Sequence, residues 1–433
     1  VRASARAIAA GARRAIGAMN AFTVVFLAAL AAAVGLETWL NLRQLAHLRA
    51  HRSAVPPGFT DRVSPTAHRR GADYTIARTR LAVAVTGLDA ASLLGWTVGG
   101  GLDLLDRAWN ALDLAAPLAG AGVIASALLL SALLRLPLAA CRRFAVDARF
   151  ELNRTTPRLF ATDALTKGLL LAGVAAPLTA LILWSMDAAG SLRWPVAWVL
   201  WTAYVVVRTW AYPGLVAPLF NRFAPLPDDG LRKRIAALLE RCDLRLGEVA
   251  VMDGSRRSTH GNASVAGIGR GKRVVLLDTL VDGLDPDEIA AVLAHELGHL
   301  KRRHIAKHLA VTAVASLGCL MLLGWLAARP GFFAGLGVDR PSPQAALALL
   351  LLSLPTLAVF AKPLVAAVSR RFEFEADAFA TRHVDPRLLV RALEKLYRTN
   401  AESLSSDPIY SAFHHSHPPP LARITRLADA VSG

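Results

Sequence analysis

The sequence carries little charge for its length. Of its 433 residues, 19% are Asp, Glu, Lys or Arg and 54% are hydrophobic, and the mean hydropathy is +0.40. Soluble domains typically contain about 25% charged residues. The composition therefore excludes an ordinary soluble protein and indicates an integral membrane protein.

Cysteine is also scarce. Cys141, Cys242 and Cys319 are scattered without CxxC spacing, and two of them adjoin predicted membrane spans. This pattern indicates neither a disulfide framework nor a thiolate metal site, so the three are expected to be packing residues. The sequence also has no internal repeat, and no low-complexity segment beyond its richness in alanine and leucine.

Long apolar runs are abundant. A helix needs about 20 apolar residues to cross roughly 30 Å of hydrocarbon. Three of the runs are weaker because they contain Glu37, Asp89 or Arg208. The first run is too long to be a removable secretory signal and lacks the small-residue cleavage pattern of one. It is therefore expected to remain as an anchor. Seven spans are predicted: 22–42, 81–101, 114–134, 168–186, 194–219, about 308–328 and about 344–362.

The net charge of +17 is distributed unevenly. Arginines are frequent in the segments after the first and third spans, and few occur in the segments after the second and fourth spans. The segment after the first span is a basic loop at 43–80, which is expected to be partly helical. The positive-inside rule then places the N-terminus outside and the C-terminus inside, although Arg2, Arg6, Arg13 and Arg14 oppose this. Such charge suits an anionic lipid surface, and no nucleic-acid partner is expected.

Two regions are predicted along the chain. Residues 1–220 form a membrane domain with about five spans, and residues 221–433 form a more polar domain that holds the last two. In the second domain, EVAVMD and KRVVLLDTL read as short strands of a small sheet. Asp285 followed by Pro286 and Glu288 is the signature of a helix start. The predicted fold is thus mostly α-helical.

The helix that begins there contains AHELGHLKRRH. His295 and His299 are four residues apart and share a helical face, and Glu296 flanks them. A catalytic zinc ion takes three protein ligands and leaves a fourth position open, and it raises the acidity of water for a general base such as Glu296. The alternative is a chance pattern of histidines that cap or hydrogen-bond on a cytosolic helix.

The third ligand must come from another part of the chain. An HExxHxxGxxH site needs a histidine at 305, but that residue is Ile305, and His304 is one position off. In SRRFEFEADAFA, Glu373 and Asp377 are spaced i, i+4 on one helical face. Glu373 can supply the carboxylate ligand, and Asp377 can hydrogen-bond a ligand histidine. A solvated charged helix is the alternative.

Two further segments supply candidate residues. In HHSHPPPLARITRL, His417 and Arg423 could stabilise the oxyanion that forms when water attacks an amide, although surface histidines more often have no role. In HGNASVAGIG, small residues would let a substrate backbone pair as an added strand beside Asn262 and Ala263. An ordinary turn is the alternative there.

Taken together, these stretches resemble the type I CAAX prenyl protease family, the sterile-24 type of integral-membrane zinc endopeptidase. The resemblance covers nearly the whole chain and rests on APLFNRFAPLPD, MDGSRRSTHGNA, KRVVLLDTL, AHELGHLKRRH, SRRFEFEADAFA and SHPPPLAR, in the family's order. It implies one zinc ion (Zn2+) per chain held by His295, His299 and Glu373, with Glu296 catalytic and Asp377 behind a ligand. The histidine and arginine of the C-terminal segment match contacts to substrate and transition state.

The resemblance also implies a barrel of seven tilted helices around a large chamber, and peptide or protein substrates that are lipidated or membrane-embedded. Ser264, His415 and Pro420 depart from the family pattern, which bears on substrate preference. A composition rich in alanine and arginine but poor in lysine is typical of a high-GC bacterium, so the expected location is a bacterial inner membrane, with the active-site domain on the cytoplasmic side. The alternatives are an HtpX-like quality-control protease and a non-catalytic, zinc-stabilised membrane chaperone.

Overall fold

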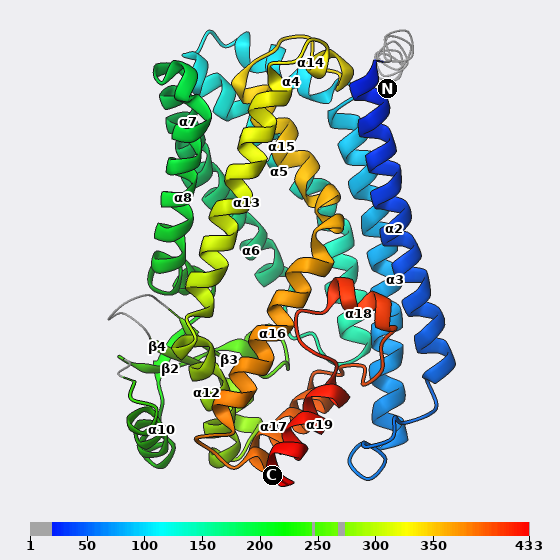
Figure 1. The fold of residues 1–433 in the computed structure, drawn as a ribbon, viewed down its shortest axis with the longest axis vertical. Coiled ribbons are helices and arrows are strands. Elements are labelled where there is room, and N and C mark those ends of the chain that lie inside the picture. The colour runs from blue at the N-terminus through cyan, green and yellow to red at the C-terminus, as the bar shows by residue number, and fades with distance from the viewer. Residues whose placement is uncertain (1–19, 245–246, 267–272, 433) are drawn as a thin grey trace.

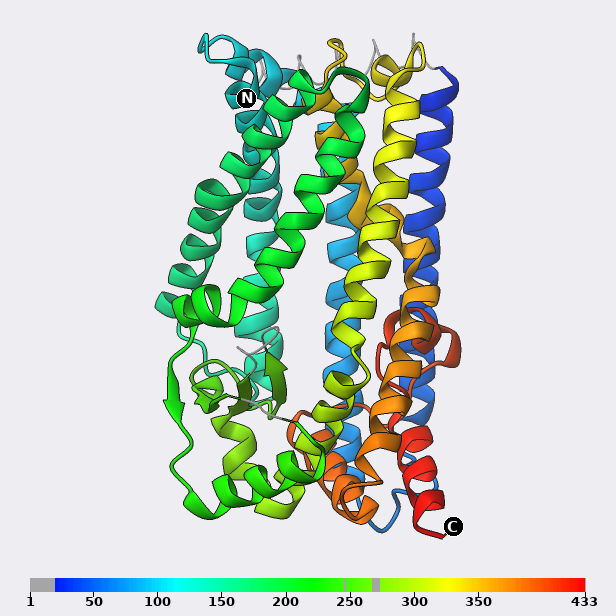
Figure 2. The same ribbon diagram turned by 60° about the vertical axis from the view of Figure 1, so that its left-hand side comes forward.

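The computed structural model describes residues 20–244, 247–266 and 273–432 (Figure 1). Long helices run side by side through most of the molecule, and a small sheet with several shorter helices is gathered at one end. Figure 2, turned by 60°, shows the same division. The four N-terminal arginines that oppose the predicted orientation lie outside the described residues.

Each predicted span coincides largely with helical structure, although the span 81–101 is interrupted by a turn at residues 97–100. The long helices are α2 (Ala21–His51), α3 (Pro65–Trp96), α5 (Ala116–Ala140), α6 (Pro157–Leu170), α7 (Ala176–Ala188), α8 (Arg193–Ala211), α13 (His304–Ala327) and α15 (Pro343–Leu357). Among the described residues, five helical segments are long and apolar enough to cross a membrane, or six if α3 and the bent α4 (Gly101–Asn110) count as one span. The predicted fold class, a mostly helical multi-span protein, is confirmed.

The remaining predicted span, residues 194–219, forms α8, a π-helical turn and the short α9 (Ala217–Phe220). Its apolar character is weaker than that of the other spans because α8 contains four tryptophans and the charged Arg193 and Arg208. The helix nevertheless packs along α13, where the indole nitrogen of Trp198 donates to the carbonyl of Ala313 at 2.8 Å.

The predicted basic loop at 43–80 is mostly helix. The helix α2 continues to His51, and α3 begins at Pro65 behind the N-cap Ser64, so only residues 52–64 connect them. Arginine is a good helix former, and the two helices therefore extend past their apolar stretches without a break. Arg43, within this extension, pairs with Asp407 at 2.8 Å.

The sheet has four short strands: β1 (Phe223–Pro225), β2 (Val249–Met252), β3 (Ala263–Ala266) and β4 (Arg273–Leu277). Their order is β1-β2-β4-β3, with β2 parallel to β4 and the outer strands antiparallel to their neighbours. The two predicted strands correspond to β2 and β4. Because β3 pairs only with β4 among the described strands, its other edge is available to a further strand.

Below the long helices, α12 (Pro286–Lys301) forms the centre of a hydrophobic core. Its Ile289, Leu293 and Leu297 are buried among residues of the other elements. The backbone nitrogen of Asp285 donates to the carboxylate of Glu288 at 3.0 Å, so the predicted capping box is present. The elements around it are α10 (Asp229–Arg241), α11 (Asp278–Gly283), α16 (Lys362–Ala380), α17 (Pro386–Thr399) and α19 (Pro420–Ser432).

Candidate metal centre

The two histidines of α12 face the same side, as their spacing predicts. His295 is buried and His299 is half-buried, and their Nε2 atoms lie 3.1 Å apart. Two imidazole nitrogens this close, each with a lone pair to offer, form the start of a metal site.

Glu373 on α16 completes the cluster. Its Oε1 lies 3.3 Å from His299 Nε2, and its Oε2 lies 3.5 Å from His295 Nε2. The two helices approach closely at Gly298, where an added Cβ would lie 2.9 Å from the Cα and carbonyl oxygen of Ala376. Glycine at this position therefore permits the contact that brings the carboxylate to the histidines.

The donor set suits a metal ion. The ligand atoms of His295, His299 and Glu373 all lie within 4.8 Å of one another. The Glu373 Oε2 atom is buried and accepts no well-aligned hydrogen bond from any described residue. Burial alone would raise the pKa of Glu373, but the surrounding imidazoles hold that pKa well below its usual range. A buried, ionised carboxylate oxygen beside two imidazoles is suited to a cation.

Glu296 lies beside this cluster and makes no hydrogen bond or ion pair with any described residue. Its side chain is half-buried, and burial raises the pKa of its carboxyl. A carboxylate that is free of partners and has a raised pKa is suited to accept and return a proton.

Behind His295, an acid and a base hold the ring in place. His295 Nδ1 lies 2.8 Å from Asp377 Oδ1, which leaves Nε2 directed at the cluster. Arg423 on α19 binds the same carboxylate through two nitrogens, at 2.7 and 2.8 Å. Although burial opposes it, hydrogen bonding to Arg423 and His295 lowers the pKa of Asp377 to about 2.

His417 reaches the cluster from the C-terminal segment. Its Nδ1 lies 2.7 Å from Glu373 Oε2, and its side chain is 67% exposed, so it has one face toward open space. The turn before it is fixed by Arg370, whose Nη1 donates to the carbonyl of His415 at 2.9 Å. Arg423, by contrast, is buried, with Nη1 3.7 Å from Glu373 Oε2.

The edge strand β3 packs against α12. Ala263 opens the strand and is buried, whereas Asn262 just before it is exposed. The carbonyl of Asn262 accepts from the backbone nitrogen of Leu277 at 3.0 Å, which continues the pairing with β4. The pair predicted to align a substrate backbone thus lies at the open edge of the sheet, beside the helix that carries the histidines.

Comparison with known proteins agrees with this arrangement. Residues 44–222 match "CAAX prenyl protease N-terminal, five membrane helices", and residues 225–431 match "Peptidase family M48". A CAAX prenyl protease 1 homolog of Arabidopsis thaliana is 35% identical over 67% of this chain and 69% of its own, and that of Oryza sativa is 31% identical over 92% and 95%. The chain belongs to peptidase family M48. The crystal structure of Ste24p from S. mikatae matches it with a TM-score of 0.86 at 26% identity, over 94% of this chain and 99% of the other.

Membership of family M48 makes the chain a membrane metallopeptidase of the CAAX prenyl protease type, as the resemblance implied. The family implies a bound metal, and the three donors described above are the group of histidines and acids that could hold one among the described residues.

One part of this peptidase's site escaped prediction. His299 Nδ1 lies 2.9 Å from His304 Nδ1, and His304 Nε2 lies 3.2 Å from Glu375 Oε2. On an unbroken helix, residues five apart do not share a face. The chain turns between α12 and α13 at Arg303, whose φ is +55°, and this turn returns His304 to His299. The two positively charged residues of that turn, Arg302 and Arg303, gave no indication of it.

Proposed function

We propose that this peptidase is a zinc endopeptidase whose metal is held by His295, His299 and Glu373. The observation that carries the proposal is the convergence of their ligand atoms within 4.8 Å, with one buried carboxylate oxygen free of well-aligned donors. Two imidazoles and a carboxylate are a common ligand set for catalytic zinc. When bound, zinc would polarise the scissile carbonyl and lower the pKa of water in the site.

The remaining residues have separable roles. Glu296 takes a proton from the attacking water and passes it to the leaving amine as the C–N bond breaks. Asp377 fixes the ring of His295, and Arg423 fixes Asp377. His417 is exposed toward the open side of the cluster and donates to the oxyanion. Arg423 has only Nη1 free of the Asp377 pair, so its contribution to the oxyanion is the smaller one.

The substrate is a peptide that lies along β3. Its backbone pairs with the open edge at Asn262 and Ala263, which places a peptide bond next to α12. Because the relatives are named CAAX prenyl proteases, we propose a C-terminal segment ending in a cysteine and three residues as the substrate class. The composition of this chain is typical of high-GC bacteria, so an unprenylated, hydrophobic or membrane-embedded peptide is the proposed natural form.

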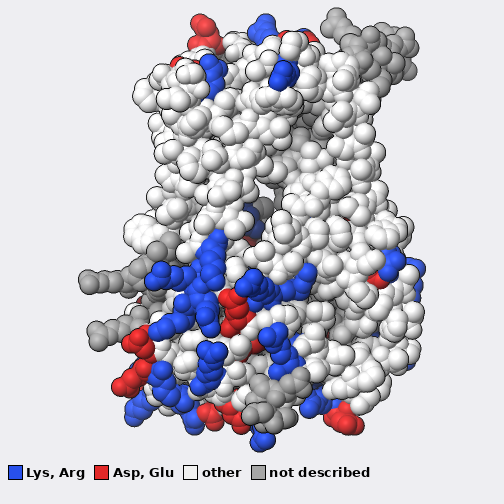
Figure 3. Space-filling view, in the orientation of Figure 1, with Lys and Arg blue, Asp and Glu red and all other residues white. Residues whose placement is uncertain are grey.

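The domain division and location follow the same reasoning. We propose that residues 1–220 form the membrane domain and residues 221–433 the catalytic domain. The catalytic end, where charged residues gather (Figure 3), would lie on the cytoplasmic side of a bacterial inner membrane.

The test uses protein purified in detergent. Zinc content is measured by mass spectrometry, and cleavage is followed with a quenched peptide ending in cysteine and three apolar residues, with and without a farnesyl group. Wild type is expected to hold about one zinc and to cleave. Glu296→Gln is expected to keep the metal and lose at least about 100-fold in kcat. Glu240→Gln on α10, an exposed glutamate outside the cluster, is the matched control.

Two results would contradict the proposal. If the protein binds zinc but cleaves neither peptide, the metal is structural, and a membrane chaperone becomes the better description. If Glu296→Gln cleaves as wild type does, the general base is another residue. Equal cleavage rates for the farnesylated and unmodified peptides would be compatible with the proposed chemistry and would show that the enzyme does not recognise the lipid.

A further inference from the structure

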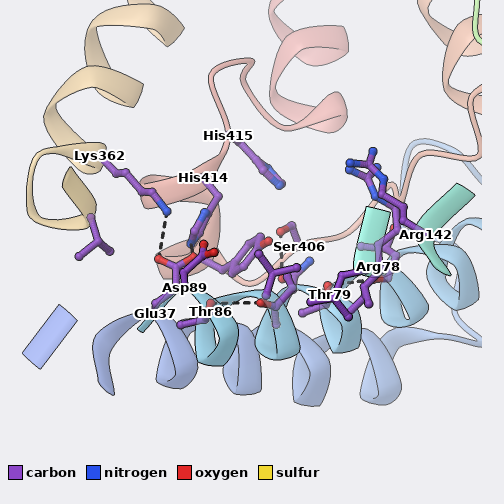
Figure 4. Close-up of a pocket in the computed structure, with 18 of the residues that line it drawn as sticks. Glu37, Arg78, Thr79, Thr86, Asp89, Arg142, Lys362, Ser406, His414 and His415 are labelled. Atoms are coloured by element: carbon purple, nitrogen blue, oxygen red, sulfur yellow. Dashed lines mark hydrogen bonds and ion pairs between the residues drawn. The ribbon is translucent and has the colours of Figure 1, made fainter. Parts of the chain in front are cut away.

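A cavity of about 860 Å³ lies between the long helices and the catalytic end. It is lined by α2, α3, α5, the end of α15 and the segment after it, the loop after α17, and α18 (Pro408–His414). Its volume is at the upper end of ligand pockets, which bury most of a small ligand or a short peptide. Figure 4 shows its charged lining, with Glu37 and Lys362 near one end and Arg78 and Arg142 near the other.

Most of the charged groups in the cavity are paired with each other. Lys362 Nζ lies 3.0 Å from Glu37 Oε2, and Arg135 Nε lies 2.6 Å from Asp89 Oδ1. Glu402 also lines the cavity, and burial raises the pKa of its carboxyl.

Two arginines in the cavity are left over. Arg78 on α3 and Arg142, in the π-helical turn after α5, form no ion pair or hydrogen bond with any described residue; Arg78 only lies over the ring of Tyr74, at 5.4 Å. The nearby Asp147 does not neutralise them, because it already accepts from the Tyr74 hydroxyl at 3.0 Å and faces Arg143 at 3.6 Å. Two unpaired guanidinium groups facing one cavity favour an anionic occupant.

The two arginines line the cavity together with a residue that lies close to β3. His260 lines the same cavity as both arginines. His260 comes two residues before Asn262, and its carbonyl accepts from Thr279 Oγ1 at 2.8 Å. The free positive charge is therefore placed just beyond the start of β3.

The cavity also leads toward the metal centre. His417 Nδ1 lies 2.7 Å from Glu373 Oε2, so the segment that carries His417 touches the cluster. His415, two residues before His417, lines the same cavity. A peptide whose scissile bond lay at the cluster and whose backbone paired with β3 could therefore extend one end to the arginines.

We propose that Arg78 and Arg142 bind the free C-terminal carboxylate of the substrate. This contact would fix the number of residues between the cleaved peptide bond and the C-terminus. The inference rests on the proposed peptidase function. A terminal carboxylate is the anion that every peptide substrate carries, and a planar guanidinium binds it through two hydrogen bonds. The site would make the enzyme prefer short C-terminal segments to internal ones.

The test compares two peptides that are identical except for the C-terminus, one a free acid and the other an amide. Wild type is expected to cleave the acid with a kcat/KM about tenfold or more above that of the amide, the value of one charge-assisted hydrogen bond. In Arg78→Gln/Arg142→Gln the ratio is expected to fall to about one, with the amide cleaved as before. The control is Arg80→Gln/Arg149→Gln, because those arginines line a separate pocket.

Binding gives a second measurement that needs no turnover. Fluorescence polarisation of the labelled acid and amide with Glu296→Gln should show the same tenfold preference for the acid. This preference should be lost when Arg78 and Arg142 are also replaced. If neither peptide is cleaved but the acid binds better, the peptidase proposal fails and the carboxylate site stands. If wild type treats acid and amide alike in both assays, or if the double variant loses only a co-purified anionic lipid, the carboxylate site is wrong.

Discussion

At the residue scale, the two histidines that we propose as metal ligands are held by different partners. His295 is oriented by an ionised aspartate that is itself fixed by a buried arginine, whereas His299 is oriented by His304 and, through it, by Glu375. Groups of this kind fix the ring and its tautomer so that Nε2 faces the metal.

His304→Ala should therefore weaken metal binding without unfolding the protein. We expect the zinc dissociation constant to rise by about 10- to 100-fold, the usual effect of removing a hydrogen-bond partner of a ligand. Competition with a fluorescent chelator measures it. His308→Ala is the matched control, since His308 lies one turn along α13 and contacts the same Phe372 ring. Equal zinc affinity in the two variants would show that His304 does not orient His299.

The buried pair of Arg423 and Asp377 predicts a different kind of loss. Arg423→Met leaves an ionised, buried aspartate without its main partner, which costs about 3–5 kcal/mol of folding stability. The melting temperature of zinc-free protein should fall markedly. His417→Ala removes an exposed side chain and should leave that temperature unchanged while lowering kcat. A stable Arg423→Met with reduced kcat alone would instead assign Arg423 to the oxyanion.

The sequence predicts which side chains lie together where this depends only on their spacing along one helix. His295 and His299, and likewise Glu373 and Asp377, lie together because residues four apart share a helical face. The partnership of Glu373 with the histidines depends on the packing of α12 against α16, which spacing does not contain. His304 and the unpaired arginines of the cavity were missed because both depend on where a helix ends or how distant helices face one another.

At the element scale, the sequence indicated where α12 begins more clearly than where the membrane helices end. A capping box is a local pattern with a direct physical cause. The ends of α2 and α3 have no such requirement, since arginine-rich stretches continue as helix past the apolar region. The connection between α2 and α3 is consequently residues 52–64, which is shorter than the predicted loop at 43–80.

The close contact of α12 with α16 gives an element-scale prediction. Gly298→Ala places a methyl group 2.9 Å from the backbone of Ala376 and should push the two helices apart. We expect a loss of about 1–3 kcal/mol in the free energy of unfolding, typical of overpacking, together with reduced zinc content. Both are read from thermal melts and metal analysis. Gly318→Ala on α13 is the control, because an added methyl there meets nothing within 4 Å. A Gly298→Ala protein as stable as that control would show that the helices adjust freely.

At the scale of the whole molecule, the distribution of charge supports the orientation that we propose. The helix α2 begins at the end of the molecule opposite α19 (Figure 1), so the described chain starts at one end and finishes at the other. On the face shown in Figure 3, charged side chains crowd the end that holds the sheet and α12, and few occur elsewhere. Basic residues near membrane helices remain on the cytoplasmic side.

Labelling with a membrane-impermeant maleimide tests this orientation. In a variant without its three native cysteines, Leu112→Cys lies between α4 and α5 at the end away from the charge, and Glu240→Cys lies on α10 at the charged end; both positions are exposed. We expect spheroplasts to be labelled at position 112 at once and at position 240 only after lysis, because the basic end is held on the inner side. The reverse pattern would place the metal centre outside the cell. In that case the free arginines of the cavity would face substrates from the envelope rather than from the cytoplasm.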